Sequence, residues 1–350
     1  MLPLEELLAG FKHIGAEDQL VFAPYFEARK SKTRFFLSPM WLGASQSFWW
    51  NLVDNCLCFI KRKCYGNPSI MLVIPPMALD GDPKIEKEVI EKFRNAGVSC
   101  ELGDDDLARY GYQSSETNKK LVEYLYRAGD YLTLEGKAWS GWRWSLNKFQ
   151  TQGLILREWT GKEIPPPDVI AACTFVAGRW KANKCLDPES KPAAWRPHLG
   201  SLNLYGDFVK FSPWPCRLML IESPTHEPLM FTIQQGVPGG CLLLTKYHDS
   251  TPEAWGGIDI SRLGHLMECR AAAKLNGPET LCNLGAAVGE GEKGVGAAKQ
   301  NLRPSGVIQV HHLPPHIKLT MDAFRSSNPS KEAPEKTNSE SKNLALDFFD

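Results

Sequence analysis

The 350-residue chain lacks an excess of charge of either sign, because 40 lysine and arginine residues balance 40 aspartate and glutamate residues. A nucleic-acid or anionic-lipid partner would therefore have to be bound by a local basic patch rather than by the field of the whole protein. The sequence also lacks any run approaching the about 20 consecutive apolar residues of a membrane-spanning helix. Its N-terminus lacks the basic segment and apolar core of a secretory signal. We therefore expect a cytoplasmic protein without an integral membrane segment.

Sequence motifs of several enzyme classes are missing as well. No C-x-x-C pair occurs among the ten cysteines, and there is no zinc-type spacing of cysteine and histidine, no H-E-x-x-H and no G-x-S-x-G. Cys56, Cys58 and Cys64 could together bind a metal, but buried thiols are the favoured interpretation. The sequence thus predicts reduced cysteines and a site without a metal ion.

Strand and helix signals alternate in the first half of the chain. The apolar run at 69–74 predicts a buried strand, and Asp82 followed by Pro83 predicts the start of a helix that ends at Gly97. A second strand is expected at 98–102. The segment 119–126 fits a helix and a strand equally. Leu121 and Leu125 suit one face of a helix, and the alternation of 121, 123 and 125 with 122, 124 and 126 also suits a strand. The alternation indicates an α/β fold.

The second half begins after a basic, tryptophan-rich helix expected over 137–150. A domain boundary is expected between 160 and 167. Beyond it the sequence predicts a helix, three strands, two helices and a last strand, at 167–180, 218–221, 229–233, 241–247, 261–275, 297–302 and 307–310. We therefore divide the folded chain into two domains, 1–160 and 161–324.

The last residues, 325–350, differ in composition from the rest. They are polar, contain proline and are almost free of apolar residues until the end, which predicts a disordered tail. The tail closes with Leu344, Leu346, Phe348 and Phe349, a pattern that resembles the short peptides by which replication proteins bind a sliding clamp. This resemblance implies recruitment to the DNA replication machinery. The alternative is a hydrophobic chain end without a specific partner.

A glycine-rich segment, 285–296, lies between the helices predicted at 261–275 and 297–302. Residues 289–294 spell G-x-G-x-x-G, but only one strand follows, so a dinucleotide-binding unit is not favoured. Gly291, Gly294 and Gly296 instead lead into a short helix, where backbone amides could hold a phosphate or carboxylate. A flexible loop without a ligand is the alternative.

Aromatic and basic residues interleave in the segment 137–148. Three tryptophans at 139, 142 and 144 alternate with Lys137, Arg143 and Lys148, a composition that could stack bases or bind a phosphate. A core-facing tryptophan stripe with solvated cations is the other interpretation.

The stretch 123–149 resembles a signature of the soluble C-terminal domain of phosphatidylglycerol lysyltransferases. In that family a tyrosine-bearing strand precedes L-x-G-K-K and a basic helix that ends R-N-x-I-N-x-F. This chain has E-Y-L-Y at 123–126, then Gly136-Lys137, and a helix running from Arg143 to Asn147-Lys148-Phe149. The segment 231–246 resembles the family's central hairpin, and 283–304 resembles its closing motif. The resemblance covers about residues 10–320.

The resemblance implies an α/β fold with mixed sheets, made of two tandem acyltransferase units of the GNAT type. It makes 121–126 a strand, places most of the active site in the second unit, and implies an aminoacyl-tRNA as donor. Such a donor is already activated, so the protein has to hold an anion, orient the acceptor and stabilise an oxyanion. We expect the lysines of two matched motifs, Lys246 and Lys299, to contact the donor or the oxyanion. The expected substrate contacts are Lys137, Arg143, Asn147, Lys148, Gly291, Gly294 and Gly296.

The chain departs from the family's pattern at three places. The family's Arg-Asn-His run reads R-W-S at 143–145, the glutamate before its hairpin lysine reads Thr245, and the acidic pair after its asparagine reads G-A at 285–286. Two inserted residues bring Glu290 and Glu292 into the glycine loop. They either replace the missing carboxylates as catalytic residues or leave these positions without a substitute. Transfer of lysine to a lipid is therefore not favoured.

Two hypotheses from different classes follow. The first is a cytoplasmic acyl- or aminoacyltransferase that uses charged tRNA or acyl-CoA and needs no other cofactor. The second is a non-catalytic protein of the same fold that binds a sliding clamp through its tail.

Overall fold

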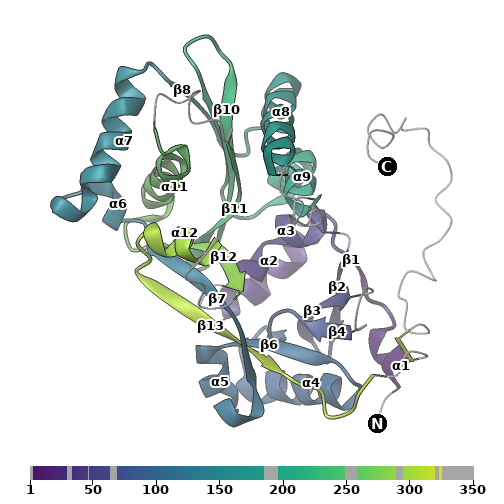
Figure 1. The fold of residues 1–350 in the computed structure, drawn as a ribbon. Coiled ribbons are helices and arrows are strands. Elements are labelled where there is room, and N and C mark those ends of the chain that lie inside the picture. Colours follow the sequence, from purple (N-terminus) through teal and green to yellow (C-terminus); the bar gives the residue numbers. More distant parts are fainter. Residues whose placement is uncertain are drawn as a thin grey trace, which may run out of the picture.

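One mixed sheet of 13 strands runs through the computed structural model, which describes residues 3–29, 34–45, 47–63, 69–184, 196–248, 258–288, 295–319 and 323–324 (Figure 1). The tail at 325–350 lies outside the described residues. The strands are β1 (Lys12–His13), β2 (Phe48–Val53), β3 (Cys56–Lys63), β4 (Ser69–Leu72), β5 (Met77–Ala78), β6 (Ser99–Gly103), β7 (Asn118–Arg127), β8 (Ile155–Gly161), β9 (Cys216–Glu222), β10 (Pro228–Val237), β11 (Gly240–His248), β12 (Leu281–Val288) and β13 (Gly306–Leu313).

The order of the strands joins the two halves of the chain. It is β1-β2-β3-β4-β6-β13-β7-β12-β11-β10-β9-β8, and β5 pairs with β3 outside this path. The last strand, β13, is antiparallel to both β6 and β7 and so lies between two strands of the first half. In turn β8 pairs with β9 of the second half. The division at residue 160 stays a prediction.

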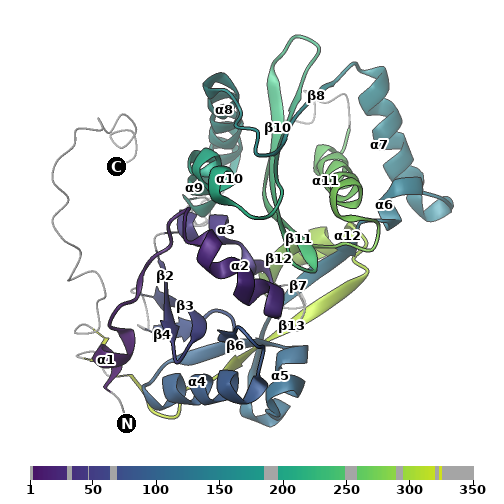
Figure 2. The same cartoon turned by 180° about the vertical axis from the view of Figure 1, so that it is seen from behind.

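The helices cover both faces of the sheet (Figures 1 and 2). The α-helices are α1 (Leu4–Leu8), α2 (Gln19–Ala28), α3 (Pro39–Ala44), α4 (Pro83–Asn95), α5 (Asp104–Tyr110), α6 (Asp130–Thr133), α7 (Ser140–Thr151), α8 (Pro167–Lys184), α9 (Arg196–Asn203), α10 (Tyr205–Phe211), α11 (Ile260–Asn276) and α12 (Val295–Asn301), and the 3-10 turns are η1 (Phe35–Leu37), η2 (Ser114–Glu116) and η3 (Lys137–Trp139).

A shared core holds the two halves together. Helices α2 and α3 of the first half pack with α8 and α10 of the second in one hydrophobic cluster that includes Phe22, Phe26, Val176 and Phe208. Figure 2 shows these helices side by side. A fully buried side chain of this size contributes about 2 kcal/mol. A separate cluster under α6, α7 and α11 packs against β7, β11 and β12, and it supports the site described below.

Most predicted elements are present, with small differences at their ends. The ambiguous segment 119–126 is the strand β7, as the resemblance implied. Helix α4 begins as predicted, because the Asp82 carboxylate accepts a hydrogen bond from the Lys84 amide at 2.8 Å. The helix expected over 137–150 is a 3-10 turn followed by α7. Gly136 precedes this turn with φ of 85°, a conformation that side-chain-bearing residues rarely adopt.

Candidate functional site

A buried carboxylate on β7 organises the centre of the site. Glu123 is completely buried and forms an ion pair of 2.9 Å with the Nε of Arg34, which is equally buried. It also accepts hydrogen bonds from the Phe35 amide at 2.9 Å and from the Asn283 side chain at 2.7 Å. A buried charge needs such partners, because burial without them is costly. Glu123 therefore fixes η1 and β12 relative to β7.

Asn283 shapes a bulge in β12. Its side-chain oxygen accepts a hydrogen bond from the Gly285 amide at 2.8 Å, and the register with β7 shifts between Asn283 and Ala286. Gly285 has φ of 75°, and a Cβ there would lie 3.2 Å from the Phe35 ring, so only glycine fits without strain. The bulge turns the carbonyls of residues 284 and 285 away from the ladder.

These two carbonyls hold Lys299 of α12. Its Nζ donates hydrogen bonds to the Leu284 oxygen at 2.8 Å and to the Gly285 oxygen at 2.9 Å. Burial lowers the pKa of Lys299 to about 8, Glu123 acts against this, and the nearby charge of Lys246 adds to it. Lys299 can therefore exchange a proton close to neutral pH.

Lys246 of β11 belongs to the same electrostatic neighbourhood. It is opposite Thr232 of β10 in the ladder, and its Nζ donates a hydrogen bond to the Ser261 carbonyl at 3.2 Å. Burial lowers the pKa of Lys246, while Glu268, Cys269 and Asp259 act against this. The charge of Lys246 on β11 therefore acts on Lys299 of α12, and these are the two lysines that the sequence analysis selected.

Helix α11 adds two titratable groups that the sequence analysis missed. His265 and Glu268 lie one turn apart and are completely buried. Burial raises the pKa of Glu268 to about 7 against the effect of Lys246 and Arg217. Burial and the Lys246 charge lower the pKa of His265, so this ring is neutral. The apolar periodicity that predicts this helix does not mark His265 or Glu268 as functional residues. Neither residue belongs to a short sequence motif.

The strands that carry these groups pair only briefly. β11 and β12 are parallel and pair over residues 240–242 with 281–283. Beyond that point β11 continues beside β10, and β12 continues beside β7. Within the described residues, no strand pairs with the other edge of β11 from Leu243 onward. Lys246 lies on this part of β11.

The predicted substrate contacts at 137–148 lie on η3 and α7, whereas Lys246 and Lys299 lie on β11 and α12. Arg143 donates hydrogen bonds to the carbonyls of Leu134 and Gly136, the latter at 2.8 Å, so it fixes the turn before α7. Lys137 and Asn147 are exposed, and the Lys148 Nζ lies 5.7 Å from the centre of the Trp144 ring. Trp144 is itself 46% exposed. The face is therefore accessible, and its substrate role stays a prediction.

The remaining predicted residues are placed as follows. Gly296 lies in α12, the helix that carries Lys299. Eight lie outside the described residues: Glu290, Glu292, Gly291 and Gly294 of the loop, and Leu344, Leu346, Phe348 and Phe349 of the tail. Arg34, Glu123 and Asn283 were not selected. Glu123 and Asn283 stand within the family-like segments, whereas nothing in the sequence around Arg34 marked it.

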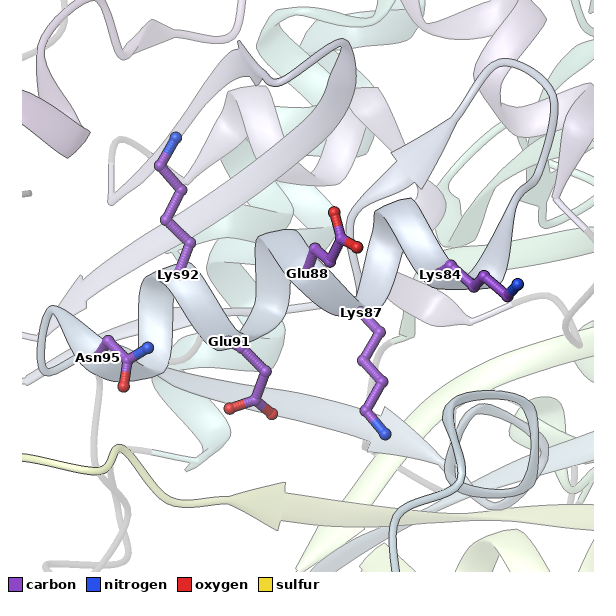
Figure 3. A pocket seen from close by; sticks show the side chains of 6 residues that line it. All are labelled: Lys84, Lys87, Glu88, Glu91, Lys92 and Asn95. Atoms are coloured by element: carbon purple, nitrogen blue, oxygen red, sulfur yellow. The ribbon is translucent and has the colours of Figure 1, made fainter. Parts of the chain in front are cut away.

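A surface hollow lies elsewhere, on the outer face of α4 (Figure 3). Its lining is Lys84, Lys87, Glu88, Glu91, Lys92 and Asn95. These side chains carry charges of both signs, and none of the site residues above is among them. In the parts of the chain that the structure describes, no group of three or more His, Cys, Asp or Glu side chains is arranged to hold a metal ion. The hollow therefore adds nothing to the site.

Comparison with solved structures identifies the fold. A conserved protein of unknown function from Bacteroides thetaiotaomicron matches with a TM-score of 0.64 and 14% identity, over 87% of this chain and 98% of that one. L-PGS from Bacillus licheniformis matches with a TM-score of 0.58 and 15% identity, over 90% and 98% of the two chains. The C-terminal domain of a putative lysylphosphatidylglycerol synthetase from Agrobacterium fabrum matches with a TM-score of 0.54 and 13% identity, over 89% and 94%.

These matches confirm the resemblance that the sequence motifs indicated. The chain has the α/β fold of the lysylphosphatidylglycerol synthetase C-terminal domain. No protein-family model matches the chain, and no curated protein matches it. Among the described helices, none has both the length and the apolar composition needed to cross a membrane.

Proposed function

We propose that the protein is a cytoplasmic acyl- or aminoacyltransferase that takes an activated acyl group from an aminoacyl-tRNA or an acyl-CoA. Lys246 and Lys299 bind the donor and stabilise the oxyanion that forms at its carbonyl carbon. The observation that carries the proposal is the position of the two amines beyond the short paired segment of β11 and β12. Lys299 is bonded to the β12 carbonyls of residues 284 and 285, and Lys246 lies on β11 past the last residue that pairs with β12.

The chemistry of an activated donor suits this arrangement. An ester or thioester carbonyl needs no enzymatic nucleophile, and the enzyme gains most by orienting the acceptor and by stabilising the developing negative charge. The Lys299 ammonium is held by two carbonyls of the β12 bulge, and a cation fixed in this way stabilises negative charge that develops nearby. Its pKa of about 8 also allows proton exchange with a reacting group near neutral pH.

The edge of β11 offers a second element of donor binding. Beyond Leu242, the described residues place no strand beside the backbone N–H and C=O groups on one side of β11. An extended ligand that carries amides can pair with such an edge as an added strand does. The amide-bearing arm of an acyl-CoA has this chemistry, and the aminoacyl end of a charged tRNA carries an amine and an ester that can use the same groups.

The names of the similar structures support the aminoacyl alternative. One is the C-terminal domain of a putative lysylphosphatidylglycerol synthetase, and another is L-PGS. The acceptor is left open, because the acidic and Arg-Asn-His positions of that family are replaced in this chain. The tail peptide and a sliding-clamp partner stay a prediction.

The test is donor consumption by the purified protein. The protein is incubated with a mixed pool of charged tRNA or with acetyl-CoA, and loss of the acyl group is followed by scintillation counting and mass spectrometry. The wild type should consume one donor class, and Lys246→Met and Lys299→Met should each lower the rate at least about 100-fold, the loss expected when one oxyanion donor is removed.

A matched control separates these lysines from lysines in general. Lys274 lies exposed near the end of α11, so Lys274→Met changes the charge equally without touching the site. Its rate should equal that of the wild type. Equal rates in all three variants would contradict the proposed roles, and no consumption of either donor would favour the non-catalytic alternative.

A further inference from the structure

The tryptophans of η3 and α7 are divided between the core and the surface. Trp142 is buried, and its ring centre lies 5.3 Å from that of Tyr131 and 5.6 Å from that of Trp139. Two residues further along α7, and so on the other side of the helix, the ring of Trp144 is nearly half exposed. The structure therefore bears out both interpretations of this segment, each for a different tryptophan.

Three cations accompany the two outer rings. The Lys148 Nζ, one turn further along α7, lies 5.7 Å from the centre of the Trp144 ring. The Arg303 guanidinium lies 5.2 Å from the centre of the Trp139 ring. Lys137 of η3 is exposed beside them in the sequence. We call Lys137, Trp139, Trp144, Lys148 and Arg303 the basic-aromatic surface.

The cations of this surface have no counter-charge of their own. Between Glu135 and Glu158 the sequence contains lysines and arginines but no aspartate or glutamate. Within the described residues, none of Lys137, Lys148 and Arg303 forms an ion pair. Although the net charge of the chain is zero, the field at this surface is therefore positive and attracts an anion from outside the chain.

The arrangement fits a nucleic acid better than a membrane. A helix that lies in a membrane interface has a whole apolar face to bury there. The apolar side of α7 is already packed in the core through Trp142, Leu146 and Phe149. What is left outside is one tryptophan ring among cations, and single strands bind to such a combination by stacking a base on the ring and placing phosphates at the cations.

The basic-aromatic surface continues to the helix of the candidate site. Arg303 lies two residues beyond the end of α12, and Lys299 lies four residues before it in the sequence. The ring of Tyr131 lies 5.2 Å from that of Trp139, and its hydroxyl donates to the Leu302 carbonyl. Tyr131 thus ties η3 to the end of α12, so a strand bound on this surface would lie beside the helix that carries Lys299.

We propose that the basic-aromatic surface binds the single-stranded end of an RNA, with a base stacked on Trp144 and phosphates at Lys137, Lys148 and Arg303. The choice of RNA rests on the proposed function, because the acyl group at the end of such a strand would be led toward Lys299. An acyl-CoA carries a single base and would leave most of a surface that spans η3, α7 and the end of α12 unused. The inference selects an aminoacyl-tRNA over an acyl-CoA as the donor.

The first experiment measures RNA binding without using activity. A short single-stranded RNA with a fluorescent label is titrated with the full-length protein, and its anisotropy gives the Kd. Trp144→Ala should bind about 5- to 100-fold more weakly, the loss expected when one stacked base is released, and Trp144→Phe should restore most of the affinity. Phe175→Ala is the matched control, because Phe175 of α8 is 52% exposed and the Arg179 guanidinium lies 5.5 Å from its ring centre. Its Kd should equal that of the wild type.

The salt dependence of the same titration tests the cations. In Lys148→Met, one lost phosphate contact with a single strand should lower the slope of log Kd against log salt concentration by about 0.7. Lys87→Met is the control, because the Lys87 Nζ lies 4.9 Å from the centre of the Tyr112 ring, on helix α4 at the opposite end of the molecule (Figure 1). Its slope should equal that of the wild type.

Several results would overturn the proposal. They are equal affinities of the wild type and Trp144→Ala, a preference for DNA of the same sequence, and binding to vesicles of anionic lipid but not to RNA. If RNA binds through Trp144 and no charged tRNA is consumed, the surface stands and the transferase function fails. If acetyl-CoA is consumed and RNA does not bind, the transferase function stands and this inference fails.

Discussion

Lys299→Met should change how the stability of the protein depends on pH. In the folded protein the pKa of Lys299 is about 8, whereas its ordinary value is 10.5. The unfolded chain therefore holds more protons than the folded one between these values. Because stability rises with pH wherever the unfolded state binds more protons, Lys299 makes the protein more stable as the pH rises through this window.

The size of the effect follows from the two pKa values. One proton changes the free energy of unfolding by at most about 1.4 kcal/mol per pH unit. Between pH 7 and pH 9.5, the shift from 10.5 to about 8 corresponds to a gain of about 2 kcal/mol. Buried tyrosines and thiols titrate in the same range with the opposite sign, so the difference between variants, rather than the absolute slope, isolates the lysine.

The assay is urea unfolding at a series of pH values, followed by fluorescence and analysed by linear extrapolation. The free energy of the wild type should rise relative to that of Lys299→Met by about 2 kcal/mol over this interval. Lys274→Met, which removes an exposed charge, should run parallel to the wild type. If the curves of the wild type and Lys299→Met are parallel, Lys299 is not buried against the β12 bulge and the site geometry is wrong.

Further predictions concern the residues that support the site. Glu123→Gln leaves the buried Arg34 without its counter-charge and should lower the free energy of unfolding by about 3–5 kcal/mol, measured by urea unfolding. A loss below 1 kcal/mol would argue against a buried ion pair. Gly264→Ala forces a Cβ against Met230 and should cost about 1–3 kcal/mol, visible as a lower melting temperature. Asn283→Ala removes two hydrogen bonds that shape the bulge, so Lys299 should be labelled faster by amine reagents, and an unchanged rate would contradict its part in holding Lys299.

The sequence predicted the fold where local signals are strong. Asp82 followed by Pro83 fixed the start of α4, and proline and glycine turns separated β9, β10 and β11 correctly. Periodicity alone failed at 119–126, because β7 is buried among other strands on both sides and shows neither a clear helical nor a clear alternating pattern. Only the family resemblance decided that segment.

The candidate site was predictable only in part, because it is assembled from distant segments. Lys246 and Lys299 stand in family-like motifs, and in the structure the charge of Lys246 acts on Lys299. Arg34 reaches Glu123 across 89 positions of the sequence, and that contact depends on how η1 packs against β12. Glu268 is buried on α11 and its charge acts on Lys246, a relation that a one-dimensional pattern does not encode. The insertion of β13 between β6 and β7 is a similar long-range feature.

The most direct test of the site is protection of its lysines by a bound donor. The purified protein is labelled briefly with an amine-reactive reagent, alone and with non-hydrolysable analogues of aminoacyl-tRNA or acyl-CoA, and each lysine is quantified by mass spectrometry. A donor that binds where β11 and β12 part should slow the labelling of Lys246 and Lys299 and leave Lys274 unchanged. Equal labelling of all three lysines with either analogue at saturating concentration would contradict a donor site between these strands.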